Sequence, residues 1–260
     1  MIKSILLKIN FVHHILAICY SIVYKTKIKK LNKYWIHKKK KNFYINFHPI
    51  KNLDIFIKNY KSFTKYYNPK KNDIIFDLGS GLGQETLYFS KKIGNRGKVF
   101  SFEPDPRLFN VMKKIISLNK LKNVRLYDKA FFSQNNKLIK FNLVENWMQN
   151  SINSNKESKQ YVKIKTITLD DVIKKNKINK IDFAKFNIEG AEKFLQNGNK
   201  KFLDICKNVG ISCHDFIDGK EFKTFEIVKK ILIRNNFEIK KNESKNKIFR
   251  YYLYARKKLN

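Results

Sequence analysis

The sequence predicts an α/β protein organised around a doubly wound, Rossmann-like sheet. The first observation is an apolar run, Ile74 to Phe76, which is typical of a buried parallel strand and leads into a turn with three glycines and a helical pattern. The second is another short strand, residues 98–103, which ends in the acid Glu103. Doubly wound folds use such a strand, glycine-rich turn and helix, with an acid at the tip of the next strand, to hold a nucleotide-like ligand.

Length and composition favour one main domain with an appendage. A chain of 260 residues can bury one large core, and a hydrophobic content of 43% excludes a disordered chain. The three cysteines, Cys19, Cys206 and Cys213, have neither the spacing of metal ligands nor that of a disulfide framework. We therefore expect a reducing, cytoplasmic environment, no metal site, and buried free thiols at Cys206 and Cys213.

The net charge of +35 at pH 7 raises nucleic acid or an anionic membrane as partners. The excess is almost all lysine, since the 56 basic residues include only six arginines. Specific readers of phosphates and bases favour arginine, because its guanidinium group donates two parallel hydrogen bonds. We therefore interpret the charge as a solvated lysine surface and expect no specific nucleic-acid partner, with nucleic-acid binding as the alternative.

Residues 1–42 differ from the rest, so we predict a division between this extension and a main domain over residues 43–260. The apolar run 15–24 is shorter than the roughly 20 residues that span a bilayer, and a lysine-rich segment follows it. Two interpretations stay open. The extension is either a helical cap on the main domain, which we favour, or an interfacial helix whose basic flank lies on an anionic membrane surface.

The glycine-rich turn indicates the kind of ligand. Its spacing, Gly79-x-Gly81-x-Gly83, differs from the G-x-G-x-x-G of dinucleotide-binding proteins, and Asp77 precedes it. A carboxylate there would repel a pyrophosphate but suits a cation such as S-adenosylmethionine, which carries an amino group and a sulfonium. A tight turn with no ligand would give the same local pattern. The candidate cofactor-binding residues of this stretch are Asp77, Gly79, Ser80, Gly81, Gly83 and Gln84.

The next strands add candidates at the same edge of the sheet. Glu103, about twenty residues past the turn, is positioned to accept hydrogen bonds from both ribose hydroxyls. Pro104 and Asp105 follow it before a helix with one apolar face. A third strand is predicted over residues 123–127, and Ala130 lies just beyond its carboxyl end, where the adenine ring is expected.

Further elements follow from periodicity. Residues 137–144 and 161–166 alternate like antiparallel strands, and Thr168 with Asp171 fits a capping box that begins a helix. The remaining elements are a helix before the first strand with Leu53, Phe56, Ile57 and Tyr60 on one face, strands at 181–186 and 209–213, a helix at 222–232, and a closing antiparallel pair at 237–240 and 248–255.

Three motifs occur in a telling order: the glycine-rich turn after Asp77, Phe102-Glu103-Pro104, and Ile188-Glu189-Gly190-Ala191-Glu192. Together they resemble the FkbM family of S-adenosylmethionine-dependent methyltransferases, and the match runs from about residue 73 to 216. The resemblance implies a class I methyltransferase sheet, S-adenosylmethionine as cofactor, and a hairpin insertion around Trp147 over the acceptor site. The family usually has aspartate where this chain has Asn187.

Methyl transfer to a hydroxyl requires that the acceptor be aligned with the methyl group and that a base remove its proton. The candidate catalytic residues at the strand tips are Glu189, His214 and Asn187. Asparagine cannot act as a base. Glu189 matches the family motif and is the base that we predict, while His214, expected to titrate near neutrality, is the alternative.

We therefore predict an O-methyltransferase that acts on a hydroxyl of a small molecule or glycan. A nucleic-acid methyltransferase is the first alternative, but enzymes that methylate base amino groups usually carry N/D-P-P-Y/F where this chain has residues 187–190. A non-catalytic, membrane-associated binding protein is the second alternative, and the glycine turn with Asp77 and Glu103 argues against it. The expected location is the cytoplasm, with the membrane periphery as the alternative.

Overall fold

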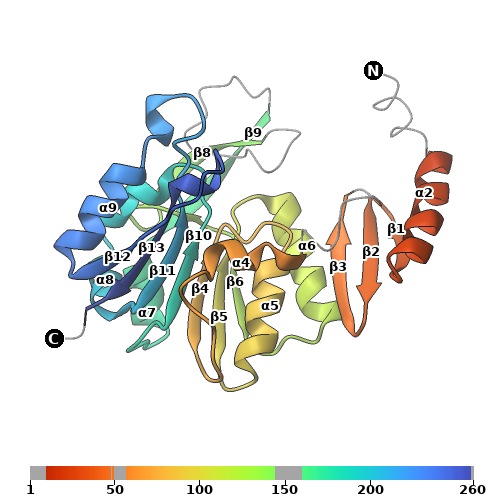
Figure 1. Cartoon of the computed structure of the whole chain (residues 1–260), viewed down its shortest axis with the longest axis horizontal. Helices are drawn as coiled ribbons and strands as arrows, with labels where there is room; N and C mark the ends of the chain where they lie inside the picture. The colour runs from red at the N-terminus through yellow and green to blue at the C-terminus, as the bar shows by residue number, and fades with distance from the viewer. Residues whose placement is uncertain (1–9, 48, 50–56, 144–159, 259–260) are drawn as a thin grey trace.

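The computed structural model describes residues 10–47, 49, 57–143 and 160–258. At its centre is a seven-stranded sheet with the strand order β12-β13-β11-β10-β4-β5-β6 (Figure 1). In this sheet β13 runs antiparallel to both of its neighbours, β11 and β12, and the other neighbouring pairs are parallel. The strands are β4 (Ile74–Leu78), β5 (Lys98–Phe102), β6 (Val124–Tyr127), β10 (Phe183–Phe186), β11 (Asn208–Ser212), β12 (Phe237–Lys240) and β13 (Tyr252–Lys257). This order, with its closing antiparallel pair, confirms the predicted class I methyltransferase sheet.

Helices cover both faces of the sheet, which is why its inner strands are continuous apolar runs. On one face, Phe76 of β4 packs against Phe202 of α8, with ring centroids 6.1 Å apart. On the other, Phe183 of β10 packs against Phe89 of α5 at 5.8 Å. The helices of this domain are α4 (Tyr60–Phe63), α5 (Gln84–Ile93), α6 (Pro106–Leu118), α7 (Leu169–Lys175), α8 (Lys200–Ile205) and α9 (Phe225–Arg234), with short 3-10 helices η2 (Ala191–Gln196), η3 (Lys220–Phe222) and η4 (Phe249–Tyr251).

The carboxyl end of β4 is the switch point of the sheet, because β5 lies on one side of this strand and β10 on the other. In the parallel register, Leu78 of β4 is level with Phe102 of β5 and with Phe186 of β10. The residues that follow these strand ends therefore meet at one edge of the sheet, and they include Gly79, Glu103 and Asn187.

A second, smaller sheet has the order β7-β9-β8, with β7 (Ala130–Phe131), β8 (Leu138–Leu143) and β9 (Gln160–Ile167). β8 and β9 are antiparallel, as predicted. The predicted cap is confirmed too, because Oγ1 of Thr168 accepts a hydrogen bond from the backbone N–H of Asp171 at 3.2 Å where α7 begins. The predicted insertion around Trp147 lies outside the described residues.

The N-terminal part forms a module of its own, residues 10–46, beside α6 (Figure 1). We call it the N-terminal module. It consists of α2 (Asn10–Val23), β1 (Lys27–Leu31), β2 (Tyr34–Lys39) and β3 (Asn42–Asn46), the three strands forming an antiparallel sheet. The helix fits the predicted extension, but the lysine-rich strands were not predicted. β3 also runs across the division that we predict at residue 42.

The β2 strand explains why this segment is sheet, because both of its faces are buried. Trp35 lies against the rings of α2, with the His14 centroid 5.2 Å away, while Tyr34 faces α6, where Nζ of Lys114 lies 5.9 Å from its ring. The predicted helix with Leu53, Phe56, Ile57 and Tyr60 on one face lies largely outside the described residues, and α4 begins at its last member, Tyr60. In the described part of the chain, no helix is long and apolar enough to cross a membrane.

Candidate active site

The turn after β4 has left-handed backbone angles at all three glycines, with φ of 73°, 56° and 77° at Gly79, Gly81 and Gly83. Close packing also excludes side chains here. A Cβ at Gly79 would lie 1.9 Å from the carbonyl oxygen of Asn187, and one at Gly83 would lie 2.3 Å from Sδ of Met112. Packing of the turn against neighbouring elements therefore accounts for two of the glycines without a ligand.

Asp77 lies beneath this turn and is fully buried. Its Oδ2 accepts a hydrogen bond from Oγ1 of Thr86 at 2.5 Å, and its Oδ1 is 3.1 Å from Nζ of Lys185 on β10. Nζ of Lys185 also donates to the carbonyl oxygens of Gly79 (2.6 Å) and Leu78 (3.2 Å). We call Asp77 and Lys185 the buried ion pair. It ties the turn to β10 and balances the charge of Asp77, so a direct contact of Asp77 with the cofactor stays a prediction.

Lys185 is a site residue whose role the sequence did not reveal. Its partner Asp77 is level with it in the parallel register of β10 and β4, although the two are far apart in the sequence. A lysine inside an apolar strand is a weak sequence signal for a buried ion pair, because a buried lysine needs an acidic partner. Which carboxylate supplies that partner depends on the strand order.

Two turn residues differ in how their polar atoms are satisfied. Oγ of Ser80 is buried and donates to the carbonyl oxygen of Asp77 at 2.9 Å, so this side chain serves the turn itself. Oε1 of Gln84 is also buried, yet it has no hydrogen-bond partner in the described part of the chain. A buried acceptor without a donor costs free energy. A ligand with an ammonium or hydroxyl donor beside the turn would satisfy it, which fits S-adenosylmethionine.

Glu103 joins the turn to the tip of β5. Its Oε2 accepts the backbone N–H of Gly81 at 2.7 Å, and its Oε1 accepts that of Asp105 at 3.0 Å. Burial raises the pKa of Glu103 to about 8 against the lowering effect of these two hydrogen bonds. The carboxyl group stands where the sequence predicts it, beside the turn, and its contact with the ribose hydroxyls stays a prediction.

The other predicted cofactor residues are Pro104, Asp105 and Ala130, and they lie at the start of α6 or within the sheet β7-β9-β8. The Asp105 side chain caps α6 by accepting the backbone N–H of Arg107 at 2.8 Å, and it pairs with the Arg107 guanidinium at 2.7 Å. Pro104 is half-buried between these two acids. The Ala130 side chain is buried in a cluster with Phe141 and Ile164, so the predicted contact between Ala130 and adenine stays a prediction.

A second group of charges lies at the ends of β10 and β11, and we call it the acid–histidine cluster. Nε2 of His214 is 3.1 Å from Oε1 of Glu189, and its Nδ1 is 3.2 Å from Oε1 of Glu192. Burial alone would lower the pKa of His214, but the two carboxylates outweigh it and raise the pKa to about 10. His214 is therefore an imidazolium at neutral pH. The expectation that His214 titrates near neutrality is therefore wrong, and its role as the alternative base stays a prediction.

The two carboxylates of this cluster differ in what they can reach. Glu192 is fully buried, with Oε1 accepting the backbone N–H of Ile188 at 3.2 Å and Oε2 accepting from Oγ1 of Thr224 at 3.4 Å. The Glu189 side chain keeps 15% of its surface exposed. Glu189 also has a left-handed φ of 51°, an angle uncommon outside glycine that costs about 1–3 kcal/mol and often marks functional sites.

Asn187 joins the two halves of the site through its backbone. Its N–H donates to the carbonyl oxygen of Leu78 at 3.0 Å, and its own carbonyl oxygen packs against Gly79. Asp215, which follows His214, has a structural role, because its Oδ2 accepts the backbone N–H groups of Thr224 (3.0 Å) and Phe225 (2.9 Å) at the start of α9. The structure thus brings Asn187, Glu189 and His214 together at the predicted edge.

Sequence reasoning also missed that Glu85, in the first turn of α5, is a buried acid next to the glycine-rich turn. Nδ2 of Asn59 donates to its Oε1 at 2.7 Å, and burial raises its pKa. An acid in this position would ordinarily be read as one that favours the helix dipole at the surface. The approach of Asn59, from the segment before α4, is what buries it.

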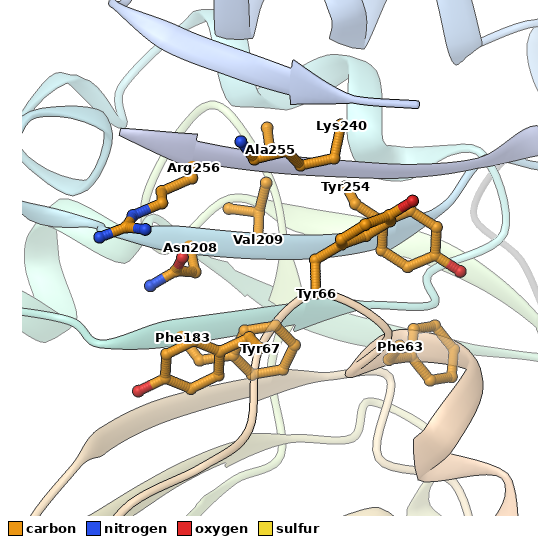
Figure 2. Close-up of a pocket in the computed structure, with 10 residues that line it drawn as sticks. All are labelled: Phe63, Tyr66, Tyr67, Phe183, Asn208, Val209, Lys240, Tyr254, Ala255 and Arg256. Atoms are coloured by element: carbon orange, nitrogen blue, oxygen red, sulfur yellow. The ribbon is translucent and has the colours of Figure 1, made fainter. Parts of the chain in front are cut away.

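The described residues also form a cavity of about 70 Å³ away from this edge (Figure 2). Phe183 and Asn208, which begin β10 and β11, line it, so it opens at the amino ends of the parallel strands. Tyr67 stacks on Phe183 within it, with ring centroids 5.1 Å apart. The cavity is far below the several hundred Å³ of ordinary ligand sites and takes no part in the candidate active site.

Comparison with known proteins gives one family. The family model described as a methyltransferase FkbM domain matches residues 39–239. No curated protein matches the chain.

Similar solved structures include a SAM-dependent methyltransferase from Aquifex aeolicus, with 18% identity, 74% of this chain and 85% of that chain covered, and a TM-score of 0.41. Another is Aeropyrum pernix fibrillarin in complex with S-adenosyl-L-methionine (11% identity, 88% and 97% covered, TM-score 0.45). A third is an rRNA methylase from Streptococcus thermophilus (14% identity, 74% and 90% covered, TM-score 0.44). Likeness at this level does not identify an acceptor for this chain.

Proposed function

Because the chain belongs to the FkbM methyltransferase family, we propose that it transfers a methyl group from S-adenosylmethionine to a hydroxyl of a small molecule or glycan. One observation carries the choice of a hydroxyl. Glu189 holds a partly exposed carboxylate at the carboxyl end of β10, beside the glycine-rich turn, and a hydroxyl acceptor needs such a base.

The cofactor part of the proposal uses the turn and the tip of β5. When bound, S-adenosylmethionine supplies a methyl group on a positively charged sulfur. Glu103 accepts hydrogen bonds from the ribose hydroxyls, and Oε1 of Gln84 accepts from a donor of the cofactor. The backbone of Gly79 and Gly81 allows close approach of the ligand, and the loop before Ala130 borders the adenine ring.

The acid–histidine cluster performs the chemistry at the acceptor. Two carboxylates surround one imidazolium, so the cluster keeps a negative charge that can receive a proton. Glu192 is enclosed, and Glu189 is the member that reaches the acceptor. The imidazolium of His214 holds the Glu189 carboxylate in place, and the carboxamide of Asn187 orients the acceptor without exchanging a proton.

A nucleic-acid acceptor is the second candidate, and the net charge of +35 is the observation that favours it. A lysine surface of this kind would attract any polyanion, with an affinity that falls steeply as salt rises. The absence of N/D-P-P-Y/F at residues 187–190 weighs against methylation of base amino groups.

Methyl transfer with an isotopically labelled cofactor distinguishes the two candidates. The purified protein is offered glycans, lipid-linked glycans and small polyols in one set, and structured RNA and duplex DNA in another, at physiological salt. We expect base-stable methyl ethers in the first set only, and their loss in Glu189→Gln. Labelling of nucleic acid with no product in the first set would replace the proposed acceptor class.

A further inference from the structure

The outward face of α2 is apolar and exposed. The helix contains no Asp, Glu, Lys or Arg over its 14 residues. Four large apolar side chains occur at helical spacing along one face, and we call them the α2 stripe: Phe11, Ile15, Ile18 and Ile22, exposed to 72%, 45%, 62% and 73%. Scattered apolar residues on a surface are normal, but a continuous row of this kind marks an interaction site.

The opposite face of α2 is fully occupied, so the direction of the stripe is set by packing. Ala17 and Tyr20 are buried, and the Tyr20 ring lies edge-on to His37 of β2 at 6.4 Å. The other face of the sheet β1–β3 packs against α6. At the end of α6, Nδ2 of Asn119 donates to the carbonyl oxygen of Phe43 at 2.8 Å, and Oδ1 of Asn119 accepts the backbone N–H of Phe43 at 2.9 Å. The stripe is therefore exposed on the face of α2 opposite the sheet β1–β3, and α2 lies at the outer end of the molecule (Figure 1).

The rest of the module is strongly and uniformly positive. No Asp or Glu occurs in the chain before Asp54, while nine lysines occur between residues 25 and 41. Elsewhere in the chain several exposed lysines have acidic partners, as in the pairs Lys175–Asp171 and Lys200–Asp204. Two of the nine, Lys30 and Lys39, stand on the face of the sheet that α2 covers, since they share it with Trp35 and His37. Lys25 and Lys27 directly follow the end of the helix.

We propose that the N-terminal module docks on an anionic lipid surface, with the α2 stripe in the boundary between head groups and acyl chains and the lysines at the head groups. An uncharged apolar face combined with a basic flank is the pattern of interfacial helices. Only one face of α2 is exposed and apolar, while Ala17 and Tyr20 pack on the opposite face, so the helix lies along the surface rather than across the bilayer.

Charge favours lipid over the other occupants of such a face. A second copy of this chain would bring the same lysine-rich, acid-free module against itself, and like charges would repel across a two-fold contact. Nucleic acid would use the lysines but leave the apolar stripe in water. An anionic membrane satisfies both features. This inference does not depend on which acceptor the enzyme methylates.

Vesicle flotation tests the proposal with the full chain. The wild type should float with vesicles of phosphatidylcholine and phosphatidylglycerol, and much less with phosphatidylcholine alone. Ile18→Glu combined with Ile22→Glu should weaken flotation by tenfold or more, on the order expected when two buried apolar side chains become charged. Ile227→Glu combined with Ile233→Glu on α9, where these side chains are 42% and 53% exposed, is the matched control and should float like the wild type.

The charge contribution is tested by a second matched pair. Lys25→Gln, Lys30→Gln and Lys39→Gln together should reduce flotation by about tenfold and flatten its salt dependence, because these lysines follow α2 or lie on the sheet face that it covers. The control is Lys140→Gln, Lys163→Gln and Lys165→Gln on β8 and β9, which removes equal charge far from α2 and should change flotation little.

Three results would overturn the proposal. One is a wild type that stays in solution with phosphatidylglycerol vesicles. Another is a stripe variant that floats as well as the wild type while circular dichroism shows both are folded. The third is a wild-type dimer in light scattering that becomes monomeric in the stripe variant without any vesicle binding, which would assign the stripe to a second copy of the chain.

Discussion

Two groups of buried charge lie at the same edge of the sheet and are built on different principles. In the buried ion pair, Asp77 and Lys185 balance one to one, and their side chains are 0% and 2% exposed. In the acid–histidine cluster, two carboxylates surround a single imidazolium, and the Glu189 side chain stays 15% exposed. The first group is closed to solvent and neutral as a unit, whereas the second keeps a negative charge at the surface of the site.

The backbone also differs between the two groups: it is hydrogen-bonded at the ion pair and strained at the cluster. Lys185 donates to the carbonyl oxygens of Gly79 and Leu78, so the ion pair satisfies main-chain groups of the turn. Glu189 instead stands on a left-handed backbone, which is strain that only surrounding structure can sustain. This difference fits the proposal that the ion pair builds the turn and that the cluster acts on the acceptor. Changes in the first group should affect stability and cofactor affinity, and changes in the second should affect turnover.

The largest expected effect is that of Glu189→Gln on turnover. The substitution keeps the shape of the side chain but removes the proton acceptor, so kcat should fall by roughly 10²–10⁴-fold. Affinity for S-adenosylmethionine, measured by calorimetry, should stay nearly unchanged, because Glu189 is assigned to the acceptor.

Glu226→Gln, on exposed α9, is the control for loss of one carboxylate. A kcat within a few-fold of wild type in Glu189→Gln would show that positioning alone drives the reaction and that the cluster has no proton-accepting role.

The next effect in size is that of Lys185→Met on stability. Removing one partner of a buried pair leaves the other charge uncompensated, which typically destabilises a protein by about 3–5 kcal/mol. Urea unfolding should show this loss, and cofactor affinity should fall with it because the turn loses its hydrogen bonds from Nζ.

Adding Asp77→Leu to Lys185→Met separates the two consequences. Stability should return toward wild type, since no charge is left unpaired, while cofactor affinity should stay low. If the single substitution leaves both quantities unchanged, the ion pair does not build the turn, and the contrast between the two groups loses its basis.

A smaller effect is expected for Glu103→Ala on cofactor affinity. Loss of charge-assisted or buried hydrogen bonds to the ribose should cost about 1.5–3 kcal/mol, which is more than tenfold in Kd. Asp105→Asn is the control, because Asp105 caps α6 and should alter stability more than affinity. Calorimetry that gives the same Kd for Glu103→Ala and wild type would remove Glu103 from the cofactor site.

Much of this edge could be predicted because its signals are local. The strand Ile74–Leu78, the three glycines and the acid after β5 lie within thirty residues or so of one another, and each has a preference that short sequence reveals. The strands after residue 160 and the helices α7 and α9 followed in the same way, whereas α8 between β10 and β11 was not predicted. Nothing local, however, indicates that Asp77 faces Lys185, since their pairing depends on β10 lying beside β4.

The features that sequence reasoning missed are those that tertiary contacts decide. The charge of His214 follows from two carboxylates, Glu189 and Glu192, that flank its ring only in the folded chain. The strands of the N-terminal module were hidden because β2 buries both faces, Trp35 toward α2 and Tyr34 toward α6, and so lacks the alternation of a half-buried strand. Its many lysines suggested a solvated segment instead.

The smallest expected effect is a difference in how stability depends on pH. The pKa of His214 is raised to about 10 in the folded state, above its ordinary value of 6.5, so the charged form favours folding. Its contribution is fully present below pH 6.5 and is lost as the pH rises to about 10. The pKa of Glu103 is raised to about 8 from 4.5, so its contribution is present below pH 4.5 and already lost above pH 8.

Between pH 8 and 10, only His214 of these two groups still titrates in the folded protein. The unfolding free energy of wild type, measured in urea, should therefore fall relative to that of His214→Asn by at most about 1.4 kcal/mol per pH unit. Relative to Glu103→Gln, the unfolding free energy of the wild type should fall between about pH 4.5 and 8. Above pH 8, the two curves of unfolding free energy against pH should run parallel. Comparing variants cancels the cysteines and tyrosines that also titrate in alkali. If the unfolding free energies of wild type and His214→Asn run parallel from pH 8 to 10, His214 is not an imidazolium. The acid–histidine cluster then lacks the charged histidine between two carboxylates that distinguishes it from the buried ion pair.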